Sequence, residues 1–496
     1  MTPMPSSPTP PTSRPRSRPF RSPGQFLRRR PLVRGALSLT AVAILNRAIG
    51  MIYRVLLARR AGAQVLGLWE MTGPLERVAA LTATLGLPIS LSQVVATAAA
   101  RGDHARARAA SRLALQLLLA ATGLTCLVIA LAAEPLGRRF LADARAIDVF
   151  RLYPLILIPS VLASWLRAYT QGYQSMLPTA FAQLAEQLVR VPAVLILLSW
   201  FLPGGAARGA QAIAVGTAAG ELAGLLLLVA LVRSRHAGLP CKAAEPAGID
   251  RLAQLRPPGI VRSPVGSGLW RELFSLGASV VASQAYGAIF SIVYLNMIPQ
   301  RLVSAGIPQE QFATLYGQLS GMVLPLLYLP MVFVNPLVRV LLPAAADAWE
   351  RQATHRLRRL LTLSLLTALT LGVGTWLVAT TRASWMISLL YGPAQVGAAR
   401  YLTLLSWAAP FVFTYHVLVA VLYGMGQTLS VVSILVSSTV ARYAVTWHLA
   451  ALPGWGFDGV VAGILVDDIL SPLLAAVVLG VTWYRRLRRS DPRPSR

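Results

Sequence analysis

Residues 35–58 read GALSLTAVAILNRAIGMIYRVLLA, an apolar stretch with Asn46-Arg47 near its middle. About 20 apolar residues are enough to span the hydrocarbon core of a bilayer, and comparable runs recur along the 496 residues of the chain. A cation at the centre of a membrane helix costs about 3 kcal/mol on insertion scales, so such a residue tends to face a bundle interior or a wet cavity. We therefore expect an all-α, polytopic membrane bundle of about twelve transmembrane helices whose arginines line a central cavity suited to an anionic cargo.

The composition supports a membrane protein and argues against other classes. The chain is 55% hydrophobic and 13% charged, whereas a soluble domain carries about 25% charged residues. Its net charge of +28 sits in the N-terminal tail, in short loops and at the C-terminus, which is the placement that orients a membrane protein rather than one that binds nucleic acid. The two cysteines and five histidines show no disulfide or metal-ligand spacing. With no nucleophile elbow, P-loop or zinc-protease motif, we expect no catalytic residue, no metal and no enzyme.

The arginine and lysine bias also predicts the orientation. With about twelve spans, the basic tails and the basic loops after the second, sixth and eighth spans fall on one side, so both termini should be cytoplasmic in a multi-pass protein of the cytoplasmic membrane. The predicted organisation is a disordered basic tail (1–34), an N-terminal six-helix lobe (35–233), a cytoplasmic inter-lobe loop (234–270), a C-terminal six-helix lobe (271–485) and a second basic tail (486–496).

The chain repeats itself at an interval of about 250 residues. Arg190 follows Gly172 by eighteen residues, and Arg442 follows Gly424 by the same number. Glu221 in the sixth span likewise matches Asp468 in the twelfth. Two pseudo-symmetric six-helix lobes with a substrate site between them are typical of transporters.

Five arginines lie within apolar stretches: Arg47, Arg77, Arg190, Arg339 and Arg442. Arg47, with Asn46 beside it, would serve either as a phosphate contact in the cavity or as a structural interhelical ion pair. Arg77 has the same two interpretations, and Glu70 and Glu76 would act in function or as counter-charges. Arg339 lies near the end of its span and is expected to reach the interface.

Acidic residues near the repeat-related arginines suggest pairing or ion coupling. Glu186 lies four residues before Arg190, a spacing that favours an intrahelical pair. Arg442 has Ser438 at the corresponding position, so it needs another partner or a place in the cavity. Intramembrane acids can carry protons or sodium ions. Coupling to a proton or sodium gradient and simple counter-charge pairing both remain open for Glu221, Asp467 and Asp468.

Several segments resemble one known family. The stretches NRAIGMIYRVLLAR (46–59), LGLPISLS (85–92) and LYGQLSGM (315–322) are similar to the stage V sporulation protein B and polysaccharide biosynthesis flippases. These belong to the multidrug/oligosaccharidyl-lipid/polysaccharide exporter superfamily. The resemblance covers about residues 34–486. The chain departs from it in the basic tail, in the Pro/Gly-rich inter-lobe loop and in lacking two C-terminal helices that many relatives carry.

The resemblance implies two six-helix lobes and alternating access. It also implies a polyprenyl-pyrophosphate-linked sugar cargo, or a peptidoglycan precursor for the spore cortex, carried from the inner to the outer leaflet. Arg47 matches a cavity arginine of related lipid II flippases, and Arg77 matches a second one. No cofactor is implied. A monomer is expected, working with membrane lipids and cell-wall polymerases.

Two alternatives compete with the flippase interpretation. A cation-coupled multidrug exporter of the same superfamily usually has an acid in its first helix, where this chain has Arg47. A membrane scaffold for cell-wall assembly would need no polar cavity, so it predicts that neutralising Arg47 leaves activity intact.

Overall fold

The computed structural model describes residues 31–238 and 268–490, and within these two ranges every regular element is a helix. The first range contains α2 (Pro31–Thr84), α3 (Leu87–Ala100), α4 (His104–Phe140), η1 (Ala144–Ala146), α5 (Ile147–Arg151), α6 (Tyr153–Gly172), α7 (Leu177–Phe201), η2 (Leu202–Gly204) and α8 (Ala206–Gly238). The second range contains α10 (Leu269–Ser304), α11 (Gln309–Tyr316), the π-helical η3 (Gly317–Val323), α12 (Leu324–Leu327), α13 (Met331–Glu350), α14 (Thr354–Tyr391), η4 (Pro393–Ala398), α15 (Ala399–Ser406), α16 (Ala409–Gly424), α17 (Thr428–Leu449) and α18 (Phe457–Ser490). The predicted all-α bundle is confirmed.

Helix α2 folds back on itself at Gly62. This residue has φ 77° and ψ 172°, a conformation that is essentially restricted to glycine. Arg54 Nη1 and Glu70 Oε1 lie 3.8 Å apart, although sixteen residues of straight helix would separate their backbones by about 24 Å. The first two predicted spans are therefore the two arms of a hairpin.

The number of candidate spans differs from the expected twelve. In the described residues, eight helices are long and apolar enough to cross a membrane, or ten if the bent pairs α5–α6 and α15–α16 each form one span. The difference arises at two places. Both arms of the α2 hairpin fall in one candidate span, residues 45–100, and α10 is not among the candidates despite its 36 residues.

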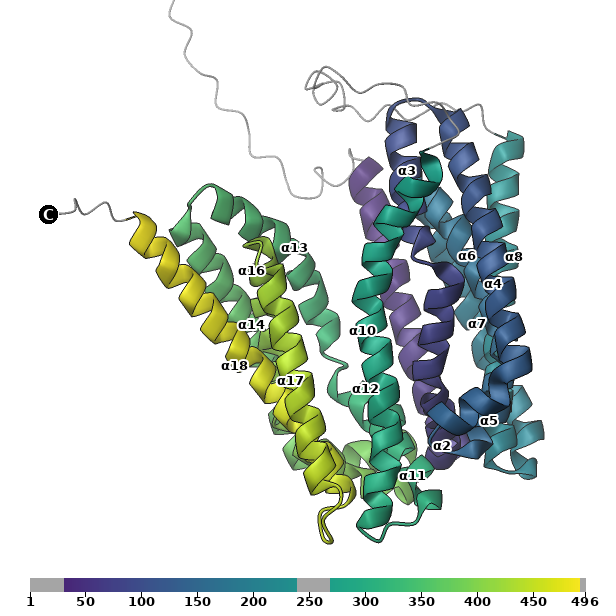
Figure 1. Ribbon diagram of the computed structural model, residues 1–496, viewed down its shortest axis with the longest axis vertical. Helices are drawn as coiled ribbons and strands as arrows, with labels where there is room; N and C mark the ends of the chain where they lie inside the picture. The colour runs from purple at the N-terminus through teal and green to yellow at the C-terminus, as the bar shows by residue number, and fades with distance from the viewer. Residues whose placement is uncertain (1–30, 239–267, 491–496) are drawn as a thin grey trace, which may run out of the picture.

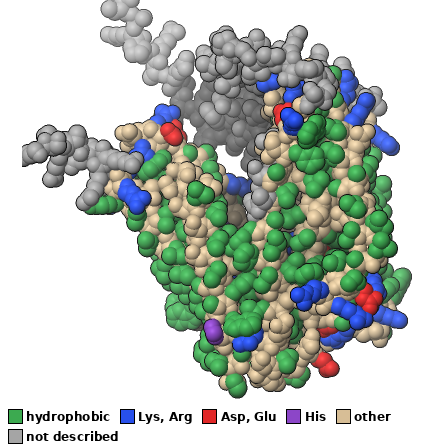
Figure 2. All heavy atoms as spheres, viewed as in Figure 1, with side chains coloured by type: hydrophobic (Ala, Val, Ile, Leu, Met, Phe, Trp, Pro, Cys, Tyr) green, Lys and Arg blue, Asp and Glu red, His purple; other side chains and the backbone are tan. Residues whose placement is uncertain are grey.

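The helices form two lobes that splay apart toward one end (Figure 1). We call this the open end; the links between α3 and α4 and between α13 and α14 lie there. The lobes meet at the opposite, closed end, near η1 and η4. Hydrophobic side chains cover the flanks of both lobes, and charged side chains gather near the two ends (Figure 2).

Helix α10 runs along the N-terminal lobe (Figure 1), although the sequence assigns it to the second half. A Cβ on Gly277 would lie 2.7 Å from the carbonyl oxygen of Leu85, so only glycine allows this close approach. Nearer the open end, Arg106 of α4 forms an ion pair with Glu272 of α10 at 2.6 Å.

A row of glycines brings α7 and α8 into backbone contact. Gly216, Gly220 and Gly224 are spaced every four residues on α8, and a Cβ at Gly220 would lie 2.7 Å from the Cβ of Arg190. Small residues at this spacing let membrane helices approach closely. Gly463 of α18 packs in the same way against Thr446 of α17.

The predicted tails and inter-lobe loop fall largely outside the described residues. This holds for most of the tail at 1–34, most of the inter-lobe loop at 234–270 and the end of the tail at 486–496. Where the chain is described, α8 continues to Gly238, α10 begins at Leu269 and α18 continues to Ser490. These helices therefore run past the boundaries that the sequence suggested.

Candidate substrate cavity

Arg47 lines two neighbouring cavities. The first has a volume of about 500 Å³ and is lined by Asn46, Arg47, Arg167, Gln183, Glu186, Gln187 and Glu221. The second has a volume of about 430 Å³ and is lined by Arg47, Tyr328, Met331, Asn335, Val412, Tyr415, His416, Leu435, Asp467, Asp468 and Ser471. We call these the N-lobe cavity and the C-lobe cavity.

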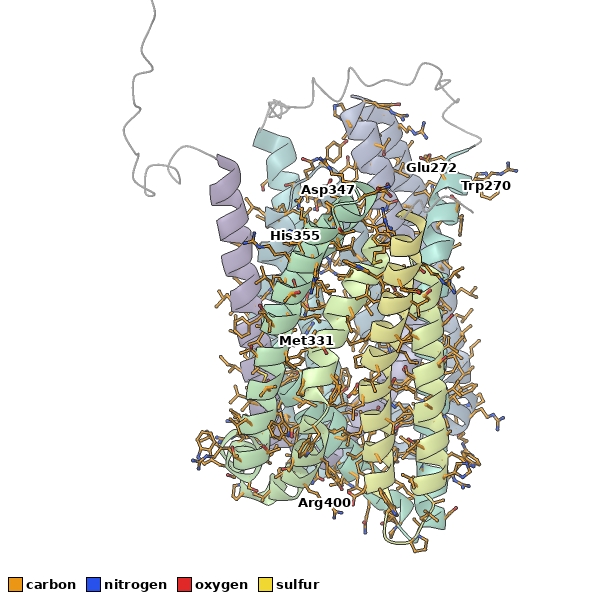
Figure 3. All side chains as sticks on the ribbon, turned by 90° about the vertical axis from the view of Figure 1, so that its left-hand side faces the viewer. Trp270, Glu272, Met331, Asp347, His355 and Arg400 are labelled. Atoms are coloured by element: carbon orange, nitrogen blue, oxygen red, sulfur yellow. The ribbon has the colours of Figure 1, made fainter. Side chains whose placement is uncertain are left out.

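The C-lobe cavity lies near the middle of the long axis. Figure 3 shows Met331, which lines the C-lobe cavity, near the middle of the long axis. Asp347 and His355 lie toward one end in the same view, and Arg400 lies at the other. A polar site at this depth is far from both membrane surfaces, which is where ionisable residues mark a transport pathway.

The guanidinium group of Arg47 is unpaired within the described part of the chain. It is exposed to the space between the lobes, and among residues 31–238 and 268–490 it forms neither an ion pair nor a hydrogen bond through its side chain. If Arg47 formed a structural interhelical ion pair, it would need an acidic partner on another helix, and the described chain supplies none within 4 Å. This geometry favours the cavity interpretation.

An ion-pair network closes the back of the N-lobe cavity. Arg190 contacts Glu186 on its own helix, as the spacing predicts, and also Glu221 of α8 at 3.2 Å. Arg167 of α6 lies 3.8 Å from Glu186. The glycine row of α8 allows these contacts because it brings the two backbones together. Arg190 is thus committed to two carboxylates and does not line the cavity.

The C-lobe cavity has a corresponding network. Arg442 lies 3.6 Å from Asp467 of α18, and its guanidinium carbon lies 4.1 Å from the centre of the Tyr294 ring. The Tyr328 hydroxyl donates a hydrogen bond to Asp468 Oδ2 at 3.0 Å. Each lobe therefore holds one arginine against an acid of its last helix, as the repeat of Arg190 with Arg442 suggests.

Three other predicted residues lie outside both cavities. Glu70 pairs with Arg54 across the α2 hairpin, and Glu76 accepts a hydrogen bond of 2.6 Å from Thr72. Arg77 is exposed and has no ion pair within the described ranges. The structure thus does not bring Arg77 and Arg47 into one cavity, and the role of Arg77 stays a prediction.

Arg339 lies one helical turn beyond Asn335, on the α13 face that lines the C-lobe cavity. Residues four apart share a helix face. The exposed Arg339 therefore lies above the cavity, toward the open end, and near the middle of α13 rather than at an end of that span. The sequence indicated a side chain that reaches the membrane interface, and it did not indicate that Arg339 lies above the cavity.

Sequence reasoning missed much of the cavity lining. Gln183, Glu186, Gln187 and Arg190 occupy positions i, i+3, i+4 and i+7 of α7, so they form one polar stripe on an apolar helix. That periodicity was a readable signal. Arg167 sits near the end of its span, where an interfacial position is the simpler interpretation. Asn335, Tyr328, Tyr415, His416 and Ser471 gave no signal.

Comparison with known proteins identifies relatives over most of the chain. A family model described as "Polysaccharide biosynthesis protein" matches residues 32–349. Stage V sporulation protein B of Bacillus subtilis (strain 168) is 27% identical over 462 residues, which cover 90% of this chain and 83% of that protein. Lipid II flippase MurJ of the same organism is 23% identical over 432 residues, or 82% of this chain and 76% of that protein.

The solved structures add the fold. An inward-facing multidrug resistance MATE family transporter of the MOP superfamily matches with a TM-score of 0.68 at 14% identity, covering 90% of this chain and 96% of that chain. A MATE structure described as the bent conformation matches with a TM-score of 0.56 at 14% identity, covering 94% and 98%. With the candidate spans and the sequence relatives, these matches describe a multi-pass membrane protein.

Proposed function

Because the chain belongs to the polysaccharide biosynthesis protein family, we propose that it is a flippase, not an enzyme. Its cargo is a polyprenyl-pyrophosphate-linked sugar or peptidoglycan precursor, which it carries across the cytoplasmic membrane by alternating access in cell-wall or spore-cortex synthesis. The relatives named stage V sporulation protein B and lipid II flippase support this cargo class.

One observation carries the proposal: the unpaired Arg47 lies where the cavities of the two lobes meet. A guanidinium group offers planar, paired donors that match phosphate oxygens. A site between two lobes that move relative to each other can hold its ligand while access changes from one side to the other. Arg47 is therefore placed to hold a pyrophosphate throughout the cycle.

The orientation supports loading from the inner leaflet. Basic residues gather at the open end in two links and the helix starts after them: Arg101, Arg106, Arg108, Arg112, Arg351, Arg356, Arg358 and Arg359. By the positive-inside rule this end is cytoplasmic. The arrangement described here is then the inward-open state, in which a precursor made in the cytoplasm enters.

A cation-coupled multidrug exporter remains the second candidate. The C-lobe cavity favours it, because Asp467 and Asp468 lie there beside the apolar Met331 and Val412. A cationic amphipath suits such a lining, but it would meet the charge of Arg47 at the same place. Efflux of ethidium from cells that express the protein tests this candidate directly.

Leaflet exchange in proteoliposomes tests the flippase. A fluorescent polyprenyl-pyrophosphate-linked sugar is added, and the rate at which label becomes accessible on the other face is followed. Arg47→Ala should slow exchange about 10- to 100-fold, since hydrogen bonds to charged groups contribute about 1.5–3 kcal/mol. Arg47→Lys should retain part of the rate because it keeps the charge but loses the paired donors.

Arg382→Ala is the matched control. Arg382 is also an exposed arginine of a long helix, α14, but it lines neither cavity. Its substitution should leave exchange near the wild-type rate. Equal rates for wild type, Arg47→Ala and Arg382→Ala would contradict the proposal.

A further inference from the structure

The N-lobe cavity is lined by residues with polar side chains. All seven residues that line it are charged or carry a side-chain amide, whereas the C-lobe cavity includes Met331, Val412 and Leu435. Its volume of about 500 Å³ falls within the range of about 300–1,000 Å³ that is usual for small-molecule sites. Most of its lining surface is polar, so the occupant that fits this cavity is a polar group rather than a lipid tail.

The charges in this cavity limit where a phosphate can bind. Glu186 and Glu221 place carboxyl groups in its walls, and Arg190 and Arg167 lie against these same acids. Among the described residues that line the cavity, Arg47 remains as the unpaired cation, and it also lines the C-lobe cavity. A pyrophosphate therefore binds at the mouth of the N-lobe cavity rather than within it.

Three oxygen atoms in the walls have no hydrogen-bond partner within the described chain. They are Asn46 Oδ1, Gln187 Oε1 and Glu221 Oε2. They belong to side chains of three helices, α2, α7 and α8, that line the same space, but the oxygens themselves are buried, so a donor in the cavity reaches them only when these side chains turn toward it. A buried oxygen acceptor needs a hydrogen-bond donor, and leaving that hydrogen bond unmade costs free energy. An ionised phosphate supplies only acceptors, whereas sugar hydroxyl groups and N-acetyl N–H groups supply donors.

We propose that the N-lobe cavity is the subsite for the sugar of the cargo. This inference rests on the proposed flippase function. The pyrophosphate lies at Arg47, and the adjoining sugar enters between Asn46, Gln183 and Gln187, whose amides both donate and accept hydrogen bonds. The head group is thus recognised by two separate parts of the site, one for charge and one for hydroxyl and amide groups.

Binding to two lipids that differ only in the sugar separates these parts. The full-length protein in lipid nanodiscs is titrated with undecaprenyl pyrophosphate and with the same lipid carrying one N-acetylhexosamine. The wild type should bind the sugar-bearing lipid about tenfold more tightly, which is the effect of one or two net hydrogen bonds. Gln187→Met should remove most of this difference while its affinity for undecaprenyl pyrophosphate stays unchanged.

Three further variants complete the test. Gln183→Met repeats the measurement at a side chain that is exposed to the cavity, where a change disturbs packing least, and it should act in the same direction. Gln116→Met, on an exposed position of α4 outside both cavities, should keep the tenfold preference. Arg47→Ala should weaken the binding of both lipids.

The outcomes distinguish this inference from the proposed function. Equal wild-type affinity for the two lipids would overturn the sugar subsite. The sugar subsite would also be overturned if Gln183→Met and Gln187→Met kept the full preference for the sugar-bearing lipid, because the cavity would then hold water alone. Failure of the wild type to bind either lipid would instead overturn the flippase proposal itself.

Discussion

Gly67 and Gly317 lie 250 positions apart in the sequence and meet across the closed end of the molecule. A Cβ on Gly67 would overlap the carbonyl oxygen of Ala313, and a Cβ on Gly317 would overlap that of Ala63. The two contacts are reciprocal: Ala63-x-x-x-Gly67 of one lobe packs on Ala313-x-x-x-Gly317 of the other. Small residues at this spacing are typical of close helix crossings in membranes, and such a self-complementary contact is expected between two-fold-related surfaces.

Side chains from each lobe also donate hydrogen bonds to the other beside this crossing. Arg59 Nε donates to the carbonyl oxygen of Leu390 at 2.7 Å. Gln309 Nε2 donates to the carbonyl oxygen of Ala142 at 3.1 Å. Both acceptors lie near the end of a lobe's long helix, where carbonyls lack intrahelical partners. The closed end is thus built to seal, and it must separate when the cavity opens to the opposite side.

We predict that Gly317→Ala opens this end. The added methyl group meets backbone rather than a movable side chain, so the lobes must shift apart. Spin labels at Trp200→Cys and Leu452→Cys, on exposed positions of the two lobes near the closed end, should report a longer distance, and leaflet exchange should fall. Gly374→Ala is the control because its Cβ would meet nothing within 4 Å. An unchanged label distance in Gly317→Ala would show that the crossing does not form the seal.

The repeat could be recognised from the sequence because it depends on spacing alone. The equivalence of Arg190 with Arg442 and of Glu221 with Asp468 anticipated which helices would carry an arginine against an acid. The contact between Gly67 and Ala313 could not be predicted in this way. It depends on how the two lobes dock, and neither motif differs locally from an ordinary helical segment. That Arg47 lines both cavities likewise depends on how far the two lobes splay apart.

Helix pairing within a lobe was partly predictable. The spacing of Glu186 and Arg190 predicted their contact, but the sequence could not show that Glu221 completes the network. The Arg54–Glu70 pair depends on the turn at Gly62. Nothing in the sequence distinguishes this glycine from the others nearby. Local periodicity identifies a polar face, whereas the partner of that face is set by tertiary packing.

Gly62→Ala should destabilise the hairpin of α2. Its φ of 77° with ψ 172° is strained for any residue with a Cβ, at a cost of about 1–3 kcal/mol. Thermal unfolding of the purified protein in detergent should shift to lower temperature. Gly50→Ala, on the first arm with nothing within 4 Å of its Cβ, should leave the protein unchanged or slightly more stable. Equal unfolding temperatures for the two variants would argue against a tight turn at Gly62.

Arg190→Met should destabilise the N-terminal lobe by about 3–5 kcal/mol, because among the described residues it leaves the buried Glu221 without a cation and leaves Glu186 only the 3.8 Å contact with Arg167. Glu186 and Glu221 side chains are only 11% and 14% exposed, so water compensates little. Converting both acids to glutamine in the same chain should restore most of the unfolding temperature. As a comparison, Arg138→Ala removes an exposed pair with Glu134 and should have little effect. If Arg190→Met alone is as stable as the variant that also carries both glutamines, burying the two carboxylates without Arg190 has no measurable cost.

The acids of α18 provide the last prediction, which concerns the energy source. We propose that Asp467 and Asp468 couple leaflet exchange to a proton or sodium gradient, since ionisable residues at mid-membrane depth often carry ions. Both acids line the C-lobe cavity, but Asp467 already lies 3.6 Å from Arg442, whereas Asp468 accepts a hydrogen bond from the neutral Tyr328 hydroxyl. Asp468 is therefore the better placed of the two to exchange an ion.

In proteoliposomes, an imposed sodium or proton gradient should accelerate directed exchange by the wild type. Asp468→Asn should remove this acceleration while the exchange measured without a gradient persists, because Arg47 and the N-lobe cavity are intact. Tyr328→Phe keeps the carboxylate and removes only its donor, so it should retain a response with a shifted ion dependence. If Asp468→Asn responds to both gradients as the wild type does, the coupling group lies elsewhere, and Asp468 serves only as the hydrogen-bond partner of Tyr328.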